Sequence, residues 1–250
     1  MPGTRRALRS LELILSCEHG GNRVPARYRE LFSASALASH RGYDAGALAV
    51  ARDFAAATGA KLFYSTVSRL LVELNRPLGH HQIFSAPALR LAPAAREELI
   101  ERYYLPYWRA VEGAVRKALR RGRRVLHLSV HSFTPRLAGV RRMTDIGLLF
   151  DPRHALEARF CQRWRDALRE HAPWLRVRHN YPYRGTADAL TTSLRENFSA
   201  RSYLGIEIEI NQKFPRGDER RWRALRAALR ASLLDACREF LMERAKRSAS

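Results

Sequence analysis

The chain has 250 residues, of which 46% are hydrophobic and 28% are charged. This composition is typical of a globular domain and excludes whole-chain disorder, a collagen-like repeat and a disulfide scaffold. The formal net charge is +21, but 41 of the 45 basic residues are arginine, and they are dispersed along the sequence. We interpret the excess as a codon bias toward arginine, and we do not expect nucleic acid to be a partner.

The first 17 residues combine basic side chains with the short apolar run 11–17, which contains Glu12. A membrane span needs about 20 apolar residues, so we expect no membrane partner. The segment also lacks the apolar centre and cleavage site of a signal peptide. Cys17, Cys161 and Cys237 are widely spaced and form no CxxC motif, which predicts a cytoplasmic protein without a structural zinc knuckle.

No repeat or linker divides the sequence, so we expect one domain over residues 1–250. β-rich runs alternate with segments of helical periodicity, and Gly59 and Gly122 are expected to end two of the helices. The predicted strands are 11–17, 61–67, 125–130, 145–151, 175–180 and 204–210, and the predicted helices are 44–58, 93–121 with an interruption near Pro106, 154–171 and 218–244. The alternation predicts an α/β fold with three αβα layers around a mixed, mostly parallel sheet.

In such folds, functional side chains gather at the carboxyl ends of the strands. The first strand is followed by the segment EHGGN, which places His19 three residues before Asn22. A histidine followed at this spacing by a ligand-type side chain is one half of a metal-binding clip. The alternative is a polar turn capped by Asn22.

A second histidine, His131, follows the strand 125–130. Two histidines at the ends of buried strands favour a shared metal ion, because neutral imidazoles are the commonest zinc ligands in catalytic sites. His127 lies inside the strand, and we expect it to be structural or to support a ligand from behind.

The last strand carries Glu207 and Glu209, two residues apart and therefore on one face. Carboxylates on an apolar strand are costly unless they are paired or functional, so one of them is a candidate general base. The alternative is an edge strand with a solvated face.

The apolar segment LLVELNRP contains Asn75 and Arg76, an amide and a guanidinium side by side that can bind a carboxylate. Arg69 is a second candidate. A Cys17–His19 nucleophilic pair is also conceivable, although Cys17 ends an apolar strand rather than starting a helix. The sequence has no GxSxG, Walker A, GxGxxG or HExxH motif.

Five segments together resemble the N-formylglutamate amidohydrolase family, from about residue 12 to residue 240. They are SCEHGGNRVP, SRLLVELNRP, VHSF, NYPYRG and IEIEINQ. This family is similar to the zinc-carboxypeptidase-like α/β hydrolases, in which a His-x-x-acid clip, an Asn-Arg pair, a lone histidine and a catalytic glutamate follow in that order.

The resemblance implies that His19 and His131 bind a metal ion, Zn²⁺ or another divalent ion. It also implies that Asn75 and Arg76 bind the substrate carboxylate. Glu209, or else Glu207, would be the base. Arg69 or Arg184 would hold a second carboxylate or polarise the scissile carbonyl.

One position departs from the family pattern, because Asn22 stands where the clip should have an acid. Either its amide oxygen is a ligand, or a carboxylate from elsewhere completes the site, with Glu18 and Asp44 as candidates, or the metal site is weakened. An uncharged amide is a poor zinc ligand.

The implied activity is hydrolysis of the amide bond of N-formylglutamate, or of a related N-acyl amino acid that carries a carboxylate, as in amino-acid catabolism and histidine degradation. One alternative is a carboxypeptidase-like hydrolase of another N-acyl amino acid or a short peptide. Another is a non-catalytic basic protein, associated with nucleic acid, on the same scaffold. The oligomeric state is left open.

Overall fold

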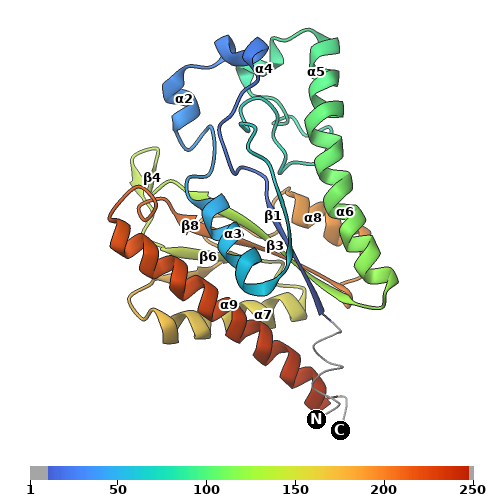
Figure 1. The fold of residues 1–250 in the computed structure, drawn as a ribbon, viewed down its shortest axis with the longest axis vertical. Helices are drawn as coiled ribbons and strands as arrows, with labels where there is room; N and C mark the ends of the chain where they lie inside the picture. The colour runs from blue at the N-terminus through green and yellow to red at the C-terminus, as the bar shows by residue number, and fades with distance from the viewer. Residues whose placement is uncertain (1–10, 248–250) are drawn as a thin grey trace.

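A computed structural model describes residues 11–247, and the basic N-terminal segment considered above lies, up to residue 10, outside the described residues. Its centre is a six-stranded sheet in the order β2-β1-β3-β8-β6-β7 (Figure 1). These strands are β1 (Leu11–Cys17), β2 (Lys61–Tyr64), β3 (Arg124–Phe133), β6 (Ile146–Leu149), β7 (Val177–His179) and β8 (Tyr203–Asn211). All neighbours pair in parallel except β6 and β8, which pair antiparallel. The mixed, mostly parallel sheet is confirmed.

Helices cover both faces of this sheet and make the predicted three layers. One apolar core is formed with α3 (Ala47–Thr58), α7 (Ala155–His171) and α9 (Glu219–Arg247). The second core, on the other face, involves α6 (Leu105–Arg120) and α8 (Leu190–Asn197). Shorter elements complete the chain: the 3-10 helix Ala26–Leu31, α2 (Ala34–Ala38), α4 (Ala86–Leu89), α5 (Pro93–Leu99) and the hairpin β4 (Arg136–Leu137) with β5 (Val140–Arg141).

The predicted interruption near Pro106 takes the form of a wider turn rather than a break. A π-helical segment, Ile100–Tyr104, joins α5 to α6, and the Leu105 N–H donates to the Ile100 carbonyl five residues earlier. Proline has no N–H to donate inside a helix, and the π turn absorbs the lost bond while the chain stays helical. Gly59 and Gly122 end their helices as predicted, both with positive φ.

β8 lies in the interior of the sheet, so the alternative of a solvated edge strand is wrong. It pairs with β3 on one side and β6 on the other. Ile206, Ile208 and Ile210 are fully buried on one face, and Glu207 and Glu209 are only 7% and 6% exposed on the other. The two carboxylates are therefore held inside the protein and need an electrostatic explanation.

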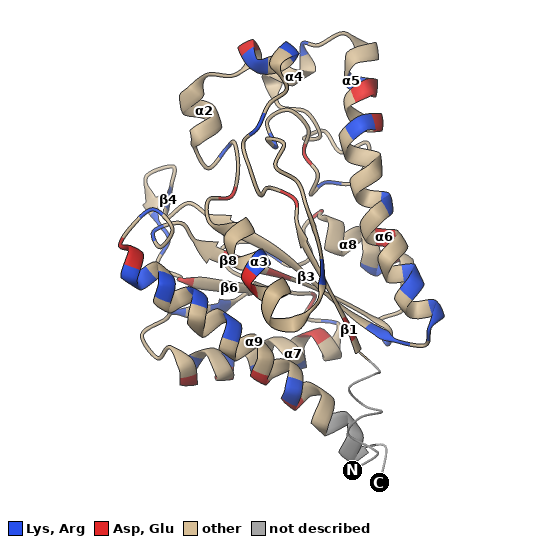
Figure 2. Ribbon diagram, viewed as in Figure 1, with Lys and Arg blue, Asp and Glu red and all other residues tan. Residues whose placement is uncertain are grey.

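The basic residues are spread over several outer elements, among them α5, α6 and α9, rather than gathered on one (Figure 2). This distribution agrees with the dispersed arginines of the sequence. Among the described residues, no helix has the length and apolar character that crossing a bilayer requires.

Gly147 of β6 has no room for a side chain, because a Cβ there would lie 1.9 Å from the Tyr181 carbonyl oxygen. Gly147→Ala should therefore lower the free energy of unfolding by at least about 1–3 kcal/mol. Gly113→Ala is the matched control: a Cβ at Gly113, in the exposed side of α6, meets nothing within 4 Å. It should stabilise the helix by about 0.5–1 kcal/mol. Urea unfolding of both variants measures the difference, and equal stabilities would contradict this packing.

Candidate functional site

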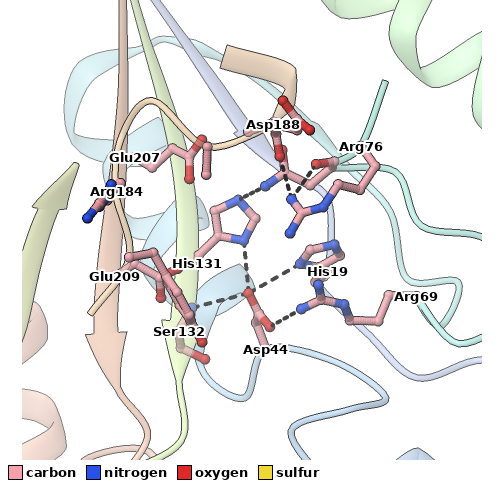
Figure 3. A pocket seen from close by; sticks show the side chains of 14 residues that line it. His19, Asp44, Arg69, Arg76, His131, Ser132, Arg184, Asp188, Glu207 and Glu209 are labelled. Atoms are coloured by element: carbon pink, nitrogen blue, oxygen red, sulfur yellow. Dashed lines mark hydrogen bonds and ion pairs between the residues drawn. The ribbon is translucent and has the colours of Figure 1, made fainter. Parts of the chain in front are cut away.

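A pocket of ≈170 Å³ opens on the α6–α8 side of the sheet, near the carboxyl ends of β1, β3 and β8 (Figure 3). Its walls come from the turn after β1, the approach to α3, the segment after β2, the strands β3 and β8, and the segment that follows β7. The lining residues are His19, Asp44, Arg69, Asn75, Arg76, His131, Ser132, Tyr183, Arg184, Ala187, Asp188, Ala189, Glu207 and Glu209. The small volume suits a small molecule rather than a polymer.

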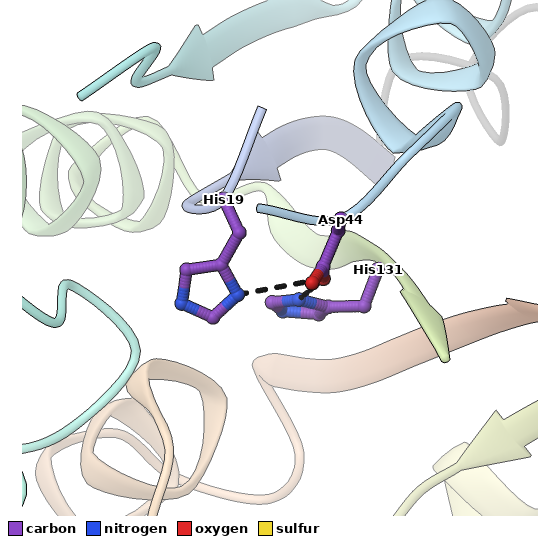
Figure 4. A group of neighbouring side chains, drawn as sticks. All are labelled: His19, Asp44 and His131. Carbon is purple, nitrogen blue, oxygen red and sulfur yellow. Dashed lines mark hydrogen bonds and ion pairs between the residues drawn. The ribbon is translucent and has the colours of Figure 1, made fainter. Parts of the chain in front are cut away.

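His19, Asp44 and His131 lie together on one side of this pocket (Figure 4). One ligand atom from each falls within 4.8 Å of the others, and all three side chains are buried. His131 Nδ1 is 2.9 Å from Asp44 Oδ2, and His19 Nδ1 is 3.4 Å from the same oxygen. Two imidazoles and a carboxylate form a suitable donor set for a divalent transition-metal ion.

The far side of each imidazole is held by a different carboxylate. His19 Nε2 contacts Glu73 Oε1, and His131 Nε2 lies 3.1 Å from Glu18 Oε2. An imidazole that donates its Nε2–H to a carboxylate presents the lone pair of Nδ1, which is the arrangement usual behind a metal-binding histidine. The residues present therefore fit a metal ion bound by the two Nδ1 atoms and Asp44.

Asn22 does not reach this group. Its side chain is exposed, and its Nδ2 donates to the Leu37 carbonyl at 3.1 Å. Asp44 is the carboxylate in the group, because the chain returns from α2 and the Asp44 N–H donates to the His19 carbonyl oxygen. Glu18 lies behind His131 and accepts hydrogen bonds from Ser129 and Tyr107.

Paired charges keep these buried acids ionised. Burial by itself would raise the pKa of Glu18, but contacts with His131 lower it to about 2. Burial opposes ionisation of Asp44 and Glu73 too, and His19, His131 and Arg69 nevertheless hold both carboxyl pKa values well below their usual range. The same contacts raise the pKa of His131 well above that of free histidine, although burial acts to lower it.

Arg69 is fully engaged by the acids of the site. Its Nε donates to Glu73 Oε2 at 2.8 Å, and its Nη1 lies 3.5 Å from Asp44 Oδ1. Glu73 also accepts from the Asn75 backbone N–H. Arg69 therefore balances buried negative charge and orders the segment that carries Asn75.

Glu207 and Glu209 both line the pocket, but their surroundings differ. Glu207 Oε1 accepts a hydrogen bond from Thr191 Oγ1 at 2.6 Å. Glu209 Oε2 is buried without a hydrogen-bond partner among the described residues. Burial raises the pKa of Glu209 to about 8, with His131 acting against this shift and Asp44 and Glu207 adding to it. Glu209 is thus a pocket-lining carboxyl group whose pKa lies closer to neutral pH than that of a free glutamate, as a general acid or base requires.

Two cationic side chains that line the pocket, Arg76 and Arg184, have no acidic partner among the described residues. Arg76 Nη1 donates to the carbonyl oxygens of Asn75 and Asp188, at 3.0 and 2.6 Å, which orients the guanidinium. Asn75 Oδ1 accepts from the Leu190 N–H at 2.9 Å, which fixes the orientation of the amide. In the part of the chain that is described, no carboxylate lies within ion-pair distance of Arg76 or Arg184, so both remain available for an anionic ligand.

Besides Asn22 and Glu18, two further sequence candidates do not line the pocket. His127 is completely buried and bridges Tyr203 OH, 2.7 Å from Nδ1, and Ser16 Oγ, 2.8 Å from Nε2. The Cys17 thiol is buried, and burial raises its pKa well above the usual value, which does not suit a nucleophile. The hydrogen bonds of His127 indicate a structural role, as predicted from its position inside the strand.

Sequence reasoning missed Glu73, which contacts His19 from behind, and the pocket residues Ser132 and Tyr183. Glu73 had a signal, a lone carboxylate inside the apolar run LLVELN, which predicts a buried partner of opposite charge. Tyr183 lies in the NYPYRG segment, where no spacing rule points to the pocket. Ser132 directly follows His131 and faces Asp44 only because of the tertiary fold.

Comparisons with known proteins relate the chain to one family and to two solved structures. The family model of N-formylglutamate amidohydrolase matches residues 11–214. A gene product from Agrobacterium tumefaciens of known crystal structure is 30% identical, with a TM-score of 0.76 and 92% of each chain covered. An N-formylglutamate amidohydrolase from Ralstonia eutropha JMP134 is 22% identical, with a TM-score of 0.72 and 95% of each chain covered, which shows a shared fold. No protein with a curated description matches the chain in sequence.

Burial lowers the pKa of His127 from 6.5 to about 4. The unfolded imidazole takes up a proton below pH 6.5 but the folded one only below about 4, so the stabilising effect is complete above pH 6.5 and is lost as the pH falls. His127→Gln cannot titrate. The stability advantage of the wild type over this variant should shrink by roughly 3 kcal/mol between pH 7 and pH 4. Urea unfolding in a chelating buffer measures it, and a constant difference would contradict a neutral buried His127.

Proposed function

The chain belongs to the N-formylglutamate amidohydrolase family of amide-hydrolysing enzymes, and we propose that it is a divalent-metal-dependent hydrolase of N-formylglutamate or a closely related N-acyl amino acid. Zinc is the metal we propose, because two imidazoles, one carboxylate and an open coordination position are the usual donor set of catalytic zinc. The products would be the free amino acid and the carboxylic acid, formate in the case of N-formylglutamate.

One observation carries this proposal: a single small pocket contains the His19–Asp44–His131 group, the unpartnered carboxyl of Glu209 and the guanidinium of Arg76. Hydrolysis of an N-acyl amino acid needs an electrophile for the acyl carbonyl, a base for water and an anchor for the carboxylate. The three groups occupy different walls of the pocket, so one substrate can meet all of them (Figure 3).

The substrate carboxylate would bind to Arg76 and to the Nδ2 of Asn75. Both are orientated by backbone contacts, and a guanidinium–carboxylate pair fixes the ligand in two directions. Arg184, on the rim, is placed to interact with a second carboxylate such as the side chain of glutamate. Anchoring at this end turns binding energy into orientation of the amide bond.

A divalent ion held by His19, Asp44 and His131 would polarise the acyl carbonyl and make water more acidic. A bound divalent cation would favour the carboxylate form of Glu209. In that form Glu209 would accept a proton from the attacking water and deliver it to the amine nitrogen as the C–N bond breaks. Glu73 and Glu18 would accept hydrogen bonds from Nε2 of the two imidazoles and hold the rings with Nδ1 toward the ion. Glu207, held by Thr191, would shape the wall beside the base.

The assignment of Asp44 rather than Asn22 is open to direct test. Asp44→Ala should weaken zinc binding by more than about 100-fold, because it removes the only charged donor of the group. Asn22→Ala should bind zinc as the wild type does, since the Asn22 side chain is exposed and its Nδ2 donates to the Leu37 carbonyl, away from the group. Competition titrations with a chromogenic chelator report both affinities. Tight zinc binding by Asp44→Ala, or its loss in Asn22→Ala, would reverse the assignment.

Activity should depend on the metal and on the substrate carboxylate. Removing metal with a chelator should abolish hydrolysis of N-formylglutamate, and added zinc should restore it. Arg76→Ala should raise KM for N-formylglutamate by about 10- to 150-fold, the effect of losing a charge-assisted pair, but should change KM little for the α-carboxamide analogue. Hydrolysis that continues in the presence of the chelator would contradict the metal-dependent mechanism. An equal rise in KM for N-formylglutamate and for its α-carboxamide analogue would contradict the role of Arg76 as the carboxylate anchor.

Glu209→Gln keeps the shape of the side chain but cannot transfer a proton. We expect kcat to fall by about 10²–10⁴, with zinc content and KM nearly unchanged. Glu207→Gln is the matched control on the same strand face and should lose much less. Steady-state kinetics together with metal analysis separates the two. A metal-loaded but inactive Glu207→Gln beside an active Glu209→Gln would exchange their roles.

A further inference from the structure

Asp44 is the one member of the His19–Asp44–His131 group whose position no strand sets. His131 is part of β3, and His19 follows β1 by two residues, whereas Asp44 lies in the loop that enters α3. The carboxylate must nevertheless stay within hydrogen-bond distance of an imidazole that the sheet holds fixed. Contacts from outside the loop are therefore needed to keep Asp44 in place.

Ser132 supplies two of these contacts. Its backbone N–H donates to Asp44 Oδ2 at 3.2 Å, and its Oγ donates to the carbonyl oxygen of Ala45 at 2.8 Å. Ser132 thus forms hydrogen bonds both to the carboxylate of Asp44 and to the backbone carbonyl of the next residue, Ala45. The Ser132 hydroxyl can make this second hydrogen bond only while its hydrogen points to the Ala45 carbonyl. A hydroxyl rotates freely unless another partner orients it.

Gln212 provides that partner. Its side chain is 2% exposed, and its Nε2 donates to Ser132 Oγ at 3.1 Å and to the Ser132 carbonyl at 3.3 Å. Its backbone N–H donates to the Phe133 carbonyl, so the residue is fixed at the carboxyl end of β8. The Nε2 group can only donate, which obliges the Ser132 oxygen to accept from it and to donate to Ala45.

We propose that Gln212 is a positioning residue that acts through Ser132 to hold Asp44 in the geometry needed to bind the metal ion. The chain of donors runs from Gln212 to Ser132 to Ala45 and joins β8, β3 and the approach to α3. This inference rests on the proposed function, since it concerns the metal ion that Asp44 would bind. Gln212, the last residue of the IEIEINQ segment, would then have a role without contacting either the substrate or the metal ion.

The test measures Co²⁺ binding to metal-free protein by visible absorption and by chelator competition. Gln212→Met removes the amide while keeping a similar length, and Ser132→Ala removes the hydroxyl. Each should weaken Co²⁺ binding by about 10- to 100-fold, the range typical of residues that support metal ligands. Because both act along one path, the double variant should be no more than a few-fold weaker than the worse single variant.

Thr144→Val is the matched control, because the Thr144 hydroxyl is buried near the same sheet edge without a hydrogen-bond partner among the described residues. It should leave Co²⁺ affinity and spectrum unchanged. Unfolding curves confirm that each variant is folded at the assay temperature. Wild-type Co²⁺ affinity in Gln212→Met, or losses that multiply in the double variant, would overturn the inference. Co²⁺ binding to the wild type is measured before any variant is compared. A wild type that binds no Co²⁺ would overturn the proposed function.

Discussion

Five carboxylates are buried near one end of the sheet: Glu18, Asp44, Glu73, Glu207 and Glu209. An isolated ion in such surroundings costs several kcal/mol, so each carboxylate needs a cation, a hydrogen-bond donor or a proton. His131, His19 and Arg69 contact three of them, Thr191 donates to Glu207, and burial raises the pKa of Glu209 so that its protonated form is favoured. The rest of the site follows from this balance of charge.

Two features that hydrolysis of an amide could use follow from this pairing of charges: the orientation of the two histidines and the carboxyl group of Glu209. The Nε2 atoms of both histidines contact carboxylates, so both Nδ1 atoms are directed to one shared oxygen of Asp44. Glu209 Oε2 has no hydrogen-bond partner in the described part of the chain, and its neighbour on β6, Gly147, has no side chain that could donate to it. The absence of a side chain at that position also lets the Tyr181 backbone cross the sheet and bring Tyr183 and Arg184 to the pocket.

Much of the fold was predictable from local pattern. Strict alternation in β8 and the apolar run of β1 correspond to strands because buried strands must repeat every two residues. The short elements α2, α8 and the β4–β5 hairpin were not predicted, because so short a segment carries little periodicity and is stabilised mainly by what it packs against. The π turn before Pro106 was predicted only as a disturbance, since a proline shows that a helical bond is lost but not how the chain absorbs the loss.

The sequence by itself determined the α/β class, the family, and the strand ends at which His19, His131, Glu207 and Glu209 stand. These properties depend on residue type and spacing along one strand. Which carboxylate joins the two histidines was decided only by the tertiary structure. Asn22 is three residues from His19 but turns outward to Leu37, whereas Asp44 is 25 residues away and is brought back by a backbone bond to His19 and held by Ser132. A contact between loops has no period in the sequence, so the carboxylate that meets His19 and His131 is set by how the loops fold over the sheet.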